Sequence, residues 1–444
     1  MREILRLAVP LALVQMGAAS LGVIDTAVVG RTTAAQLAAV GLGNSLLFAL
    51  SIVGMGLVLG TEPLIAQALG AGDPGAARRT FRQGVWLALV ATPVILLLAG
   101  GIVLALPHVG IDAEVVPYAR AYMLARMPSV LPFLLYWSVK AWLQSHGRTR
   151  APVVGVVLGN VVELGLDLAL VPTLGVVGAG IAQCVTTTVR LLVVARAAEE
   201  ALRDVGVAGE APPGTLRERA ARMRDAWVGR ELMGVARIGL PLGLQMSLEV
   251  AVFSFAAVVM GRLGKQELAA HQVAIQCAST TFNAMVGLGS AASVVVGRRI
   301  GARDPASALR AGVTSLALSC GVMGLTGAAF LFAGADLARV LTDKPDVVAG
   351  AARLLAVAAA FQLSDGLQTV ASGALRGAGD TRAAFAIHLA SHWCVGMPCV
   401  LLLVGVWGAT GVWWGLTLGL TVAAVALVAR FVVKARRGYD PLER

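Results

Sequence analysis

Long apolar segments separated by short polar loops are the dominant pattern along this 444-residue chain. A helix that crosses a membrane needs about 20 mostly apolar residues, because it rises ~1.5 Å per residue through a hydrocarbon core of roughly 30 Å. Twelve segments reach this length and predict an all-α integral membrane protein. They lie near residues 8–29, 44–69, 84–106, 121–143, 151–171, 176–195, 237–260, 271–297, 311–333, 350–374, 383–405 and 410–433.

The same landmarks occur twice along the chain at a nearly constant spacing. The segment LAVPLAL around Pro10 returns as IGLPLGL around Pro241, an offset of 231 residues. The loop motif GAGDP at 70–74 returns as GARDP at 301–305 with the same offset, and GRTR returns as GDTR 232 residues later. Such self-similarity indicates that one structural unit is present in two copies. The two prolines are expected to bend equivalent helices.

Each copy contains six of the twelve predicted spans, so both copies enter the membrane with the same orientation. This pattern predicts two pseudo-symmetric six-helix lobes related by an axis along the membrane normal. We place the N-terminal lobe at 1–196 and the C-terminal lobe at 233–444. Residues 197–232 join them as a cytoplasmic linker, in which an amphipathic segment is expected to lie on the membrane surface.

Composition and charge add orientation to this picture. Only 14% of the residues are charged, against roughly 25% in a typical soluble domain, so lipid must solvate much of the surface. The net charge of +11 comes from arginines concentrated in the even-numbered loops and the linker. Basic loops mark the cytoplasmic side, so both termini are expected to be cytoplasmic. The positive charge therefore does not require a nucleic-acid partner.

Carboxylates inside the predicted spans are the strongest candidates for functional groups. An ionised side chain at mid-membrane costs at least about 2.5–3.5 kcal/mol, and such residues usually have a role in transport. Asp25, Glu249 and Asp365 each lie within a long apolar segment. The alternative for each is a structural hydrogen bond to a neighbouring helix. Lys140 is near enough to the cytoplasmic end of its span to extend its amine to the surface.

A second acidic group lies on one face of the fifth span. Glu163 and Asp167 are four residues apart, with Asn160 one turn before them, so they share a helix face. Gln183 in the next span is placed to face them. Two close carboxylates without a cation repel each other, so one is protonated or the pair shares a bound ion. The alternative is that Asp167 lies close enough to the loop to be hydrated.

The repeat shows that these acids are not symmetry mates. Ala256 occupies the position equivalent to Asp25, and Ala18 occupies the position equivalent to Glu249. The two acids lie on the same face of equivalent helices at different depths. We therefore expect the two lobes to have related but unequal roles.

Other chemistry has little support in the sequence. His388 and His392 are four residues apart, but no third metal ligand is evident nearby, so no metal centre is expected. The chain contains no P-loop, GxSxG or HExxH motif. ATP hydrolysis and enzymatic function are therefore not expected, and neither is a cofactor. Transport would be driven by an ion gradient through the buried acids, with Na⁺ sites at Glu249 and Asp365 or at Asp25 and Asp167.

Six segments spread over the whole chain resemble the multidrug and toxic compound extrusion (MATE) family, in its bacterial NorM-like branch. The family implies two six-helix lobes in a V and exchange of Na⁺ or H⁺ for organic cations. Its conserved acids fall on Asp25, Glu249 and Asp365, while Glu163 and Gln183 depart from the usual residues. The matching segments are VPLALVQMGAASLGVIDTAVVGR, AQALGAGDP, GRTRAPVV, LPLGLQMSLEV, ELAAHQVAI and LSDGLQTVASGALRGAGDTR.

The resulting prediction is a monomeric antiporter of the bacterial inner membrane that exports small organic cations by alternating access of its lobes. Its partners are membrane lipids and those substrates. A lipid-linked oligosaccharide flippase of similar build is the main alternative, but its cleft should favour basic residues. A membrane-embedded transferase or protease would need a converging nucleophile or metal set. The residues expected to carry coupling are Asp25, Glu163, Asp167, Glu249 and Asp365, supported by Asn160, Gln183 and Gln272.

Overall fold

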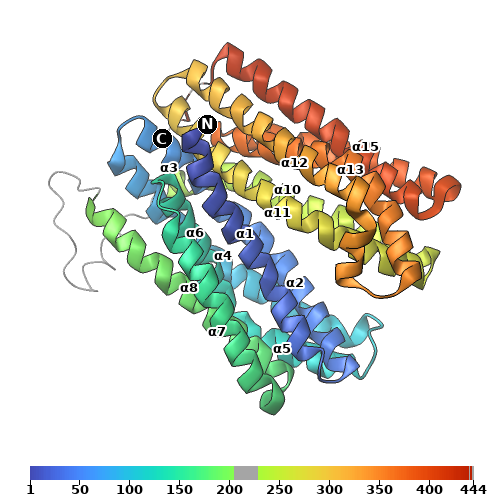
Figure 1. Cartoon of the computed structure of the whole chain (residues 1–444). Coiled ribbons are helices and arrows are strands. Elements are labelled where there is room, and N and C mark those ends of the chain that lie inside the picture. Colours follow the sequence, from blue (N-terminus) through green and yellow to red (C-terminus); the bar gives the residue numbers. More distant parts are fainter. Residues whose placement is uncertain (205–228, 440, 443–444) are drawn as a thin grey trace. The chain divides into compact units, whose positions relative to one another are not determined.

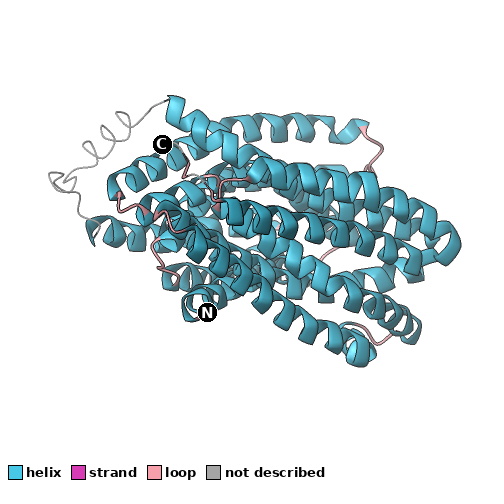
Figure 2. Ribbon diagram, turned by 90° about the horizontal axis from the view of Figure 1, so that it is seen from above, coloured by secondary structure: helices cyan, strands magenta, loops and turns pink. Residues whose placement is uncertain are grey.

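The computed structural model describes residues 1–204, 229–439 and 441–442, and at positions 21, 23–27, 203 and 204 it describes the backbone alone. Within these ranges every regular element is helical and none is a strand, as Figure 2 shows. Short turns join most of the helices. The amphipathic segment predicted in the linker lies outside the described residues.

The first half of the chain follows the predicted order of spans (Figure 1). Its elements are α1 (Arg2–Val29), α2 (Ala34–Leu59), α3 (Thr61–Gly70), α4 (Pro74–Ala105), η1 (Leu106–His108), α5 (Val115–Arg126), η2 (Met127–Ser129), α6 (Val130–Ser145), α7 (Arg150–Leu174) and α8 (Val176–Asp204). One predicted span is divided between α2 and α3, and another is divided between α5 and α6.

The second half has longer and less divided helices. Its elements are α10 (Gly229–Leu263), α11 (Lys265–Gly301), α12 (Pro305–Leu341), α13 (Pro345–Gly377), α14 (Thr381–Leu389), the π-helical segment η3 (Ala390–Gly396) and α15 (Met397–Arg437). Pro10 lies inside α1 and Pro241 inside α10, at equivalent places in the two copies.

Ten helical stretches in the described ranges are long and apolar enough to cross a membrane. The last of them, Thr381–Arg437, is interrupted at Gly408, whose φ of 55° and ψ of −133° end one crossing and begin another. The consecutive helices α5, η2 and α6 supply a further crossing. The structure therefore confirms the twelve-helix architecture.

Residues with positive φ angles occur at equivalent positions in the two copies of the sequence repeat. Gly175, between α7 and α8, has φ 57° and ψ −134°, which matches the conformation of Gly408 in the other copy. Gly72 has φ 71°, and the equivalent Arg303 has φ 56°. Only glycine adopts this left-handed region without a steric cost. The turn geometry is thus retained in the second copy although arginine replaces glycine there.

The helices that follow these two turns begin with matching caps. Asp73 precedes α4 and Asp304 precedes α12, and each carboxylate accepts a hydrogen bond from the backbone N–H three residues later, at 2.8 and 2.9 Å. Such a cap satisfies one of the amide donors that a helix start leaves unpaired. In both helices a proline follows the cap directly, where its missing N–H costs nothing.

The described chain forms two compact units. Residues 13–243 form the N-terminal unit, and residues 1–12 with 244–442 form the C-terminal unit. Each unit therefore includes the first turns of a helix that begins in the other half of the sequence. The lobe boundaries at residues 196 and 233 remain a prediction.

Glycines allow the close helix crossings that hold those first turns in place. A Cβ atom added to Gly56 on α2 would lie 2.1 Å from the Cα of Gly243 on α10, within the N-terminal unit. The equivalent addition to Gly287 on α11 would lie 2.4 Å from the nitrogen of Ala12 on α1, within the C-terminal unit. Small residues at such crossings let backbones approach closely, as is common between membrane helices.

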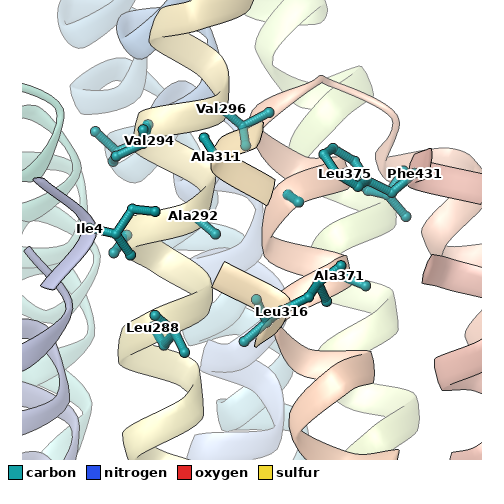
Figure 3. Packing of buried hydrophobic residues seen from close by; sticks show 14 of the residues in the cluster. Ile4, Leu288, Ala292, Val294, Val296, Ala311, Leu316, Ala371, Leu375 and Phe431 are labelled. Carbon is teal, nitrogen blue, oxygen red and sulfur yellow. The ribbon is translucent and has the colours of Figure 1, made fainter. Parts of the chain in front are cut away.

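The hydrophobic core of the C-terminal unit also includes the first turns of α1. Ile4 of α1 packs with Leu288 and Ala292 of α11, and the cluster extends to Ala371 of α13 and Phe431 of α15 (Figure 3). These side chains are at most 5% exposed. Their packing holds α11 and α13 against each other. Helix α13 also carries Asp365, one of the predicted site residues.

Candidate functional site

A closed ring of polar side chains lies inside the C-terminal unit. Glu249 on α10 accepts a hydrogen bond on Oε1 from Nε2 of Gln245 at 3.1 Å, and the same atom lies 3.0 Å from Nδ1 of His388 on α14. His388 Nε2 lies 2.8 Å from Oγ of Ser372 on α13, and Gln245 Nε2 is 3.3 Å from that hydroxyl. We refer to Gln245, Glu249, Ser372 and His388 as the Glu249 ring.

Burying these polar side chains costs folding free energy unless they form hydrogen bonds with one another. The side chain of His388 is 1% exposed and that of Glu249 is 20% exposed. A buried polar group without a hydrogen-bond partner costs about 1–3 kcal/mol. Gln245 donates to Glu249, and Ser372 is hydrogen-bonded to Nε2 of His388, whereas Nδ1 of His388 makes no hydrogen bond within the described part of the chain.

Asp365 lies close to this ring on α13. Its side chain is 3% exposed, and its Oδ1 accepts a hydrogen bond of 3.2 Å from Nε2 of Gln368. Asp365 is within electrostatic reach of Glu249. The structure thus brings together two acids that are 116 positions apart in the sequence. A site with two adjacent acids can bind a proton or a cation to relieve their mutual repulsion.

The helix that carries His388 continues into the π-helical segment η3. His392 lies in this segment and stacks on His388 with 5.5 Å between ring centroids. Its Nε2 atom is buried and has no hydrogen-bond partner among the described residues. Single π-helical turns inside α-helices often occur at functional sites. The sequence shows the spacing of the two histidines but not that one of them faces Glu249.

The N-terminal unit contains a second polar cluster, centred on Asn160 of α7. Its Nδ2 donates to the carbonyl oxygen of Gly17 and to Oγ of Ser20 on α1, both at 2.8 Å. Its Oδ1 accepts a hydrogen bond of 2.6 Å from Nη2 of Arg190 on α8. Asp25 follows on the same helix as Ser20, but its side chain lies outside the described residues.

Glu163 and Asp167 belong to the same region of α7 and are completely buried. Arg190, which is 8% exposed, is within electrostatic reach of Glu163. The sequence predicts these acids as a pair without a cation, and the structure adds Arg190 to them. Arg190 supplies the positive charge that a buried carboxylate needs. Gln183, on α8 as expected, is also buried.

Lys140 corrects another expectation. We predicted that its amine would extend to the membrane surface, but the residue is 3% exposed. Its Nζ donates a hydrogen bond of 3.0 Å to Oε1 of Gln15 on α1 and lies 3.9 Å from the centre of the Trp137 ring. The amine is therefore held inside the N-terminal unit by an amide and an aromatic face.

Gln272 differs from the other predicted polar residues because its side chain is exposed on α11. Its neighbour His271 is buried instead and packs edge-on against Trp413. Among the described residues, no group of three or more histidine, cysteine, aspartate or glutamate side chains is arranged to hold a metal ion.

Two polar clusters buried in a duplicated twelve-helix protein are typical of membrane transporters. The family model MatE matches residues 10–169 and 241–402, once in each half of the chain. The two matches begin 231 residues apart, which is the offset of the sequence repeat. The chain belongs to the MatE family of multidrug efflux transporters and is not an enzyme.

Relatives and solved structures agree with this assignment. A "Probable multidrug resistance protein NorM" from Deinococcus radiodurans is 35% identical over 99% of this chain and 96% of its own length. The protein of the same description from Bradyrhizobium diazoefficiens is 33% identical over 98% and 94%.

Among solved structures, a Vibrio cholerae MATE transporter superposes with a TM-score of 0.88 at 18% identity, covering 98% of this chain and 97% of its own. A eukaryotic MATE transporter gives a TM-score of 0.83 at 22% identity, with the same shares of the two chains covered. These similarities confirm the fold of a multi-pass membrane protein.

Proposed function

We propose that this chain is a secondary antiporter that exports organic cations in exchange for Na⁺ or H⁺ by alternating access of its two lobes. The observation that carries this proposal is the pair of acids Asp365, which is buried, and Glu249, which is 20% exposed, within electrostatic reach of each other in membrane-spanning helices. The curated relatives, which are described as probable multidrug resistance proteins, support export of drug-like substrates.

The two acids provide a simple route to exchange. An organic cation, a proton or a metal cation can each offset the charge of a carboxylate, so the coupling ion and the substrate compete for the same charge. A ligand shifts a conformational equilibrium only through a difference in affinity between two states. Protonation or ion binding at Glu249 and Asp365 would supply that difference in affinity and release the substrate. The transporter could then return to its inward-facing state.

The cluster around Asn160 has a different role in this proposal. Arg190 places positive charge within electrostatic reach of Glu163, and Lys140 is a second buried cation of the N-terminal unit, so the charge of this unit's buried acids is offset more than that of the C-terminal pair. We propose that Asp25, Glu163 and Asp167 take part in coupling, while Asn160 and Gln183 hold the helices that carry them. The two lobes then have unequal roles.

Arg190 and Lys140 also favour a second candidate, export of an anionic or lipid-linked substrate. The flippase alternative requires basic residues in a buried position, and both side chains meet that requirement. A structurally similar Pyrococcus furiosus transporter is described as having a reversed polarity of its binding pocket that suggests a different function. The cation antiporter is favoured here because Glu163 and Asp167 offset the basic charge.

We place the protein in the bacterial inner membrane with both termini in the cytoplasm, acting as a monomer. Arginines near helix ends, such as Arg298 and Arg299 in the last turn of α11 and Arg78 and Arg79 near the start of α4, support this orientation. Proteolysis of residues beyond Arg437 in right-side-out and inverted vesicles tests the placement of the C-terminus. Cleavage is expected in inverted vesicles only.

The test of the main proposal is efflux of a fluorescent organic cation from proteoliposomes under an imposed H⁺ or Na⁺ gradient. Glu249→Gln and Asp365→Asn are expected to abolish gradient-driven efflux while the protein still folds. Glu267→Gln is the matched control, because this acid lies in the first turn of α11 and pairs with the exposed Arg353. Efflux that needs neither gradient, or that survives in both variants, would contradict the proposal.

A further inference from the structure

One arginine that the proposed function does not use lies within a membrane span of the N-terminal unit. Arg126 ends α5 at the break that η2 forms before α6. It follows Val115, the first residue of α5, by 126 − 115 = 11 positions, which is about 16 Å at ~1.5 Å per residue. The span continues to Ser145. A charged side chain at such a depth is costly and marks the path of a substrate or an ion in many transporters.

Close helix crossings hold this arginine between α2 and α8. A Cβ atom added to Gly43 on α2 would lie 2.6 Å from Cδ1 of Tyr122, and one added to Gly180 on α8 would lie 2.8 Å from Cβ of Ala125. The thiol of Cys184 on α8 also donates to the backbone carbonyl oxygen of Ala125, at 3.2 Å. Two neighbouring helices therefore fix the end of α5 and the guanidinium that it carries.

The hydrogen-bond partners of this guanidinium are neutral. Nη1 of Arg126 donates to Oδ1 of Asn44 on α2, and it donates to the hydroxyl of Tyr122 at 3.1 Å. The ion pairs found among the described residues do not include Arg126. Within the described ranges, this charge is therefore held by an amide and a phenol rather than by a carboxylate.

The other side of the guanidinium is the one that fits a carboxylate. Nε and Nη2 of an arginine form a parallel pair of donors that matches two carboxylate oxygens. Arg430 shows this pairing in the same protein, because its Nε and Nη2 donate to the two oxygens of Asp380 at 2.9 and 3.4 Å. In Arg126 these two nitrogens make no hydrogen bond with the described residues and are not enclosed by protein. The side chain is half-buried, so this pair of donors is open to a ligand.

A buried acid lies at the same level of the unit. Glu163 precedes Leu174, the last residue of α7, by 174 − 163 = 11 positions, and α7 ends on the side of the membrane where α5 begins. The thiol of Cys184 is within electrostatic reach of both Arg126 and Glu163. The N-terminal unit therefore contains a guanidinium and a carboxylate at one depth, which suits a ligand that carries both charges.

We propose that Arg126 is a specificity-determining residue that binds the anionic group of the substrate through Nε and Nη2, so that the transporter prefers zwitterions with an amine and a carboxylate to plain cations. This inference rests on the proposed export function and names the substrate class within it. Asn44 and Tyr122 position the guanidinium from its other side. Arg190 is not equivalent, because its Nη2 already donates to Asn160.

Binding of two matched dyes to the purified transporter in detergent tests this preference without any transport. One dye is a rhodamine with a free carboxylate, and the other is its methyl ester, a plain cation of nearly the same shape. Fluorescence anisotropy gives the Kd of each dye. The wild type is expected to bind the free acid at least about tenfold more tightly than the ester, because the acid gains a charge-assisted bidentate hydrogen bond.

Four variants make the result specific. Arg126→Gln should lower the affinity for the free acid about tenfold without lowering that for the ester. Arg126→Lys keeps the charge but loses the paired donors, so its preference should be intermediate. Asn44→Asp places a carboxylate of the protein beside the guanidinium, and it should abolish the preference even if Arg126→Gln does not fold. Arg120→Gln is the matched control, since Arg120 is a half-buried arginine nearer the start of α5, and it should behave as the wild type does.

Replacing chloride by methanesulfonate separates the two sources of an anion. Ester binding that requires chloride in the wild type but not in Arg126→Gln would show that a free ion occupies the site, and would overturn the assignment to the substrate. The same conclusion follows if the ratio of acid to ester affinity is unchanged in both Arg126→Gln and Asn44→Asp. Absence of gradient-driven efflux by the wild type contradicts only the proposed function, and the dye affinities still decide the role of Arg126.

Discussion

Arg190 on α8 donates a hydrogen bond of 2.6 Å to Oδ1 of Asn160 on α7, and Asn160 in turn donates to the backbone of α1 at Gly17. A buried arginine is thereby connected through one amide to three helices of the N-terminal unit. The guanidinium is also within electrostatic reach of Glu163. This arrangement makes Arg190 important for stability as well as for the charge of the cluster.

Replacing Arg190 by methionine is expected to destabilise the protein by about 3–5 kcal/mol, because it removes the guanidinium charge that acts on the buried Glu163. Adding Glu163→Gln should restore much of that loss, since the carboxylate charge that Arg190 offsets is then absent. Thermal unfolding of the two variants in detergent measures both effects. A double variant no more stable than Arg190→Met would show that Glu163 does not depend on this arginine.

The helices were largely predictable from the sequence, because a membrane span has a length and an apolar composition that few other elements share. The predicted gap between residues 405 and 410 contains Gly408, where the last stretch divides. The break between α2 and α3 at Gly60 was not predicted. Both sides of that break are apolar, so hydropathy does not change across it.

The candidate site was predictable only in part. Burial cost identifies Glu249 and Asp365 from the sequence alone, since each lies within an apolar segment. Periodicity also places His388 and His392 on one helix face, but it cannot show which other helix that face meets. The contact between His388 and Glu249 joins residues 139 positions apart and depends on how α10 and α14 pack. Arg190 was missed because it lies near the predicted end of its span, where basic residues are common.

The turn before α12 provides a test of backbone strain. Arg303 has a φ of 56°, whereas the equivalent Gly72 has a φ of 71° and no comparable cost. For a residue with a Cβ atom, the left-handed conformation costs about 1–2 kcal/mol of conformational free energy. Arg303→Gly is therefore expected to raise stability by about 0.5–1 kcal/mol, and Gly72→Ala to lower it by about 1 kcal/mol. Equal unfolding temperatures for wild type and Arg303→Gly would contradict this account.

The close helix crossings predict that alanine destabilises the protein at some glycine positions and not at others. Gly56→Ala and Gly287→Ala each place a Cβ atom within 2.4 Å of the backbone of another helix, so each should cost about 1–3 kcal/mol or more. Gly100→Ala on α4 is the control, because an added Cβ there meets nothing within 4 Å. It should leave stability unchanged or raise it by up to about 1 kcal/mol. Circular dichroism melting of the three variants compares them directly.

The N-terminal cap of α12 predicts that the stability of the first turn of this helix depends on pH. Hydrogen bonds from the Ser307 hydroxyl and backbone N–H lower the pKa of Asp304 below its ordinary value of 3.8. A carboxyl whose pKa is lower in the folded protein stabilises it above the unfolded pKa, and that contribution is lost as the pH falls through the folded value. Protection of the first α12 amides against hydrogen exchange should therefore persist at pH 5 and decrease below about pH 4.

Two variants separate this cap from a general effect of acid. Asp304→Ala removes the side-chain acceptor, so the first α12 amides should exchange faster at every pH and show no further loss near pH 4. Asp304→Asn keeps an oxygen acceptor that does not titrate, so its protection should stay constant over the same range. The equivalent cap at Asp73 of α4 remains intact in both variants and serves as an internal reference. If the α12 amides of Asp304→Asn lose protection together with those of the wild type, the titrating group is not Asp304.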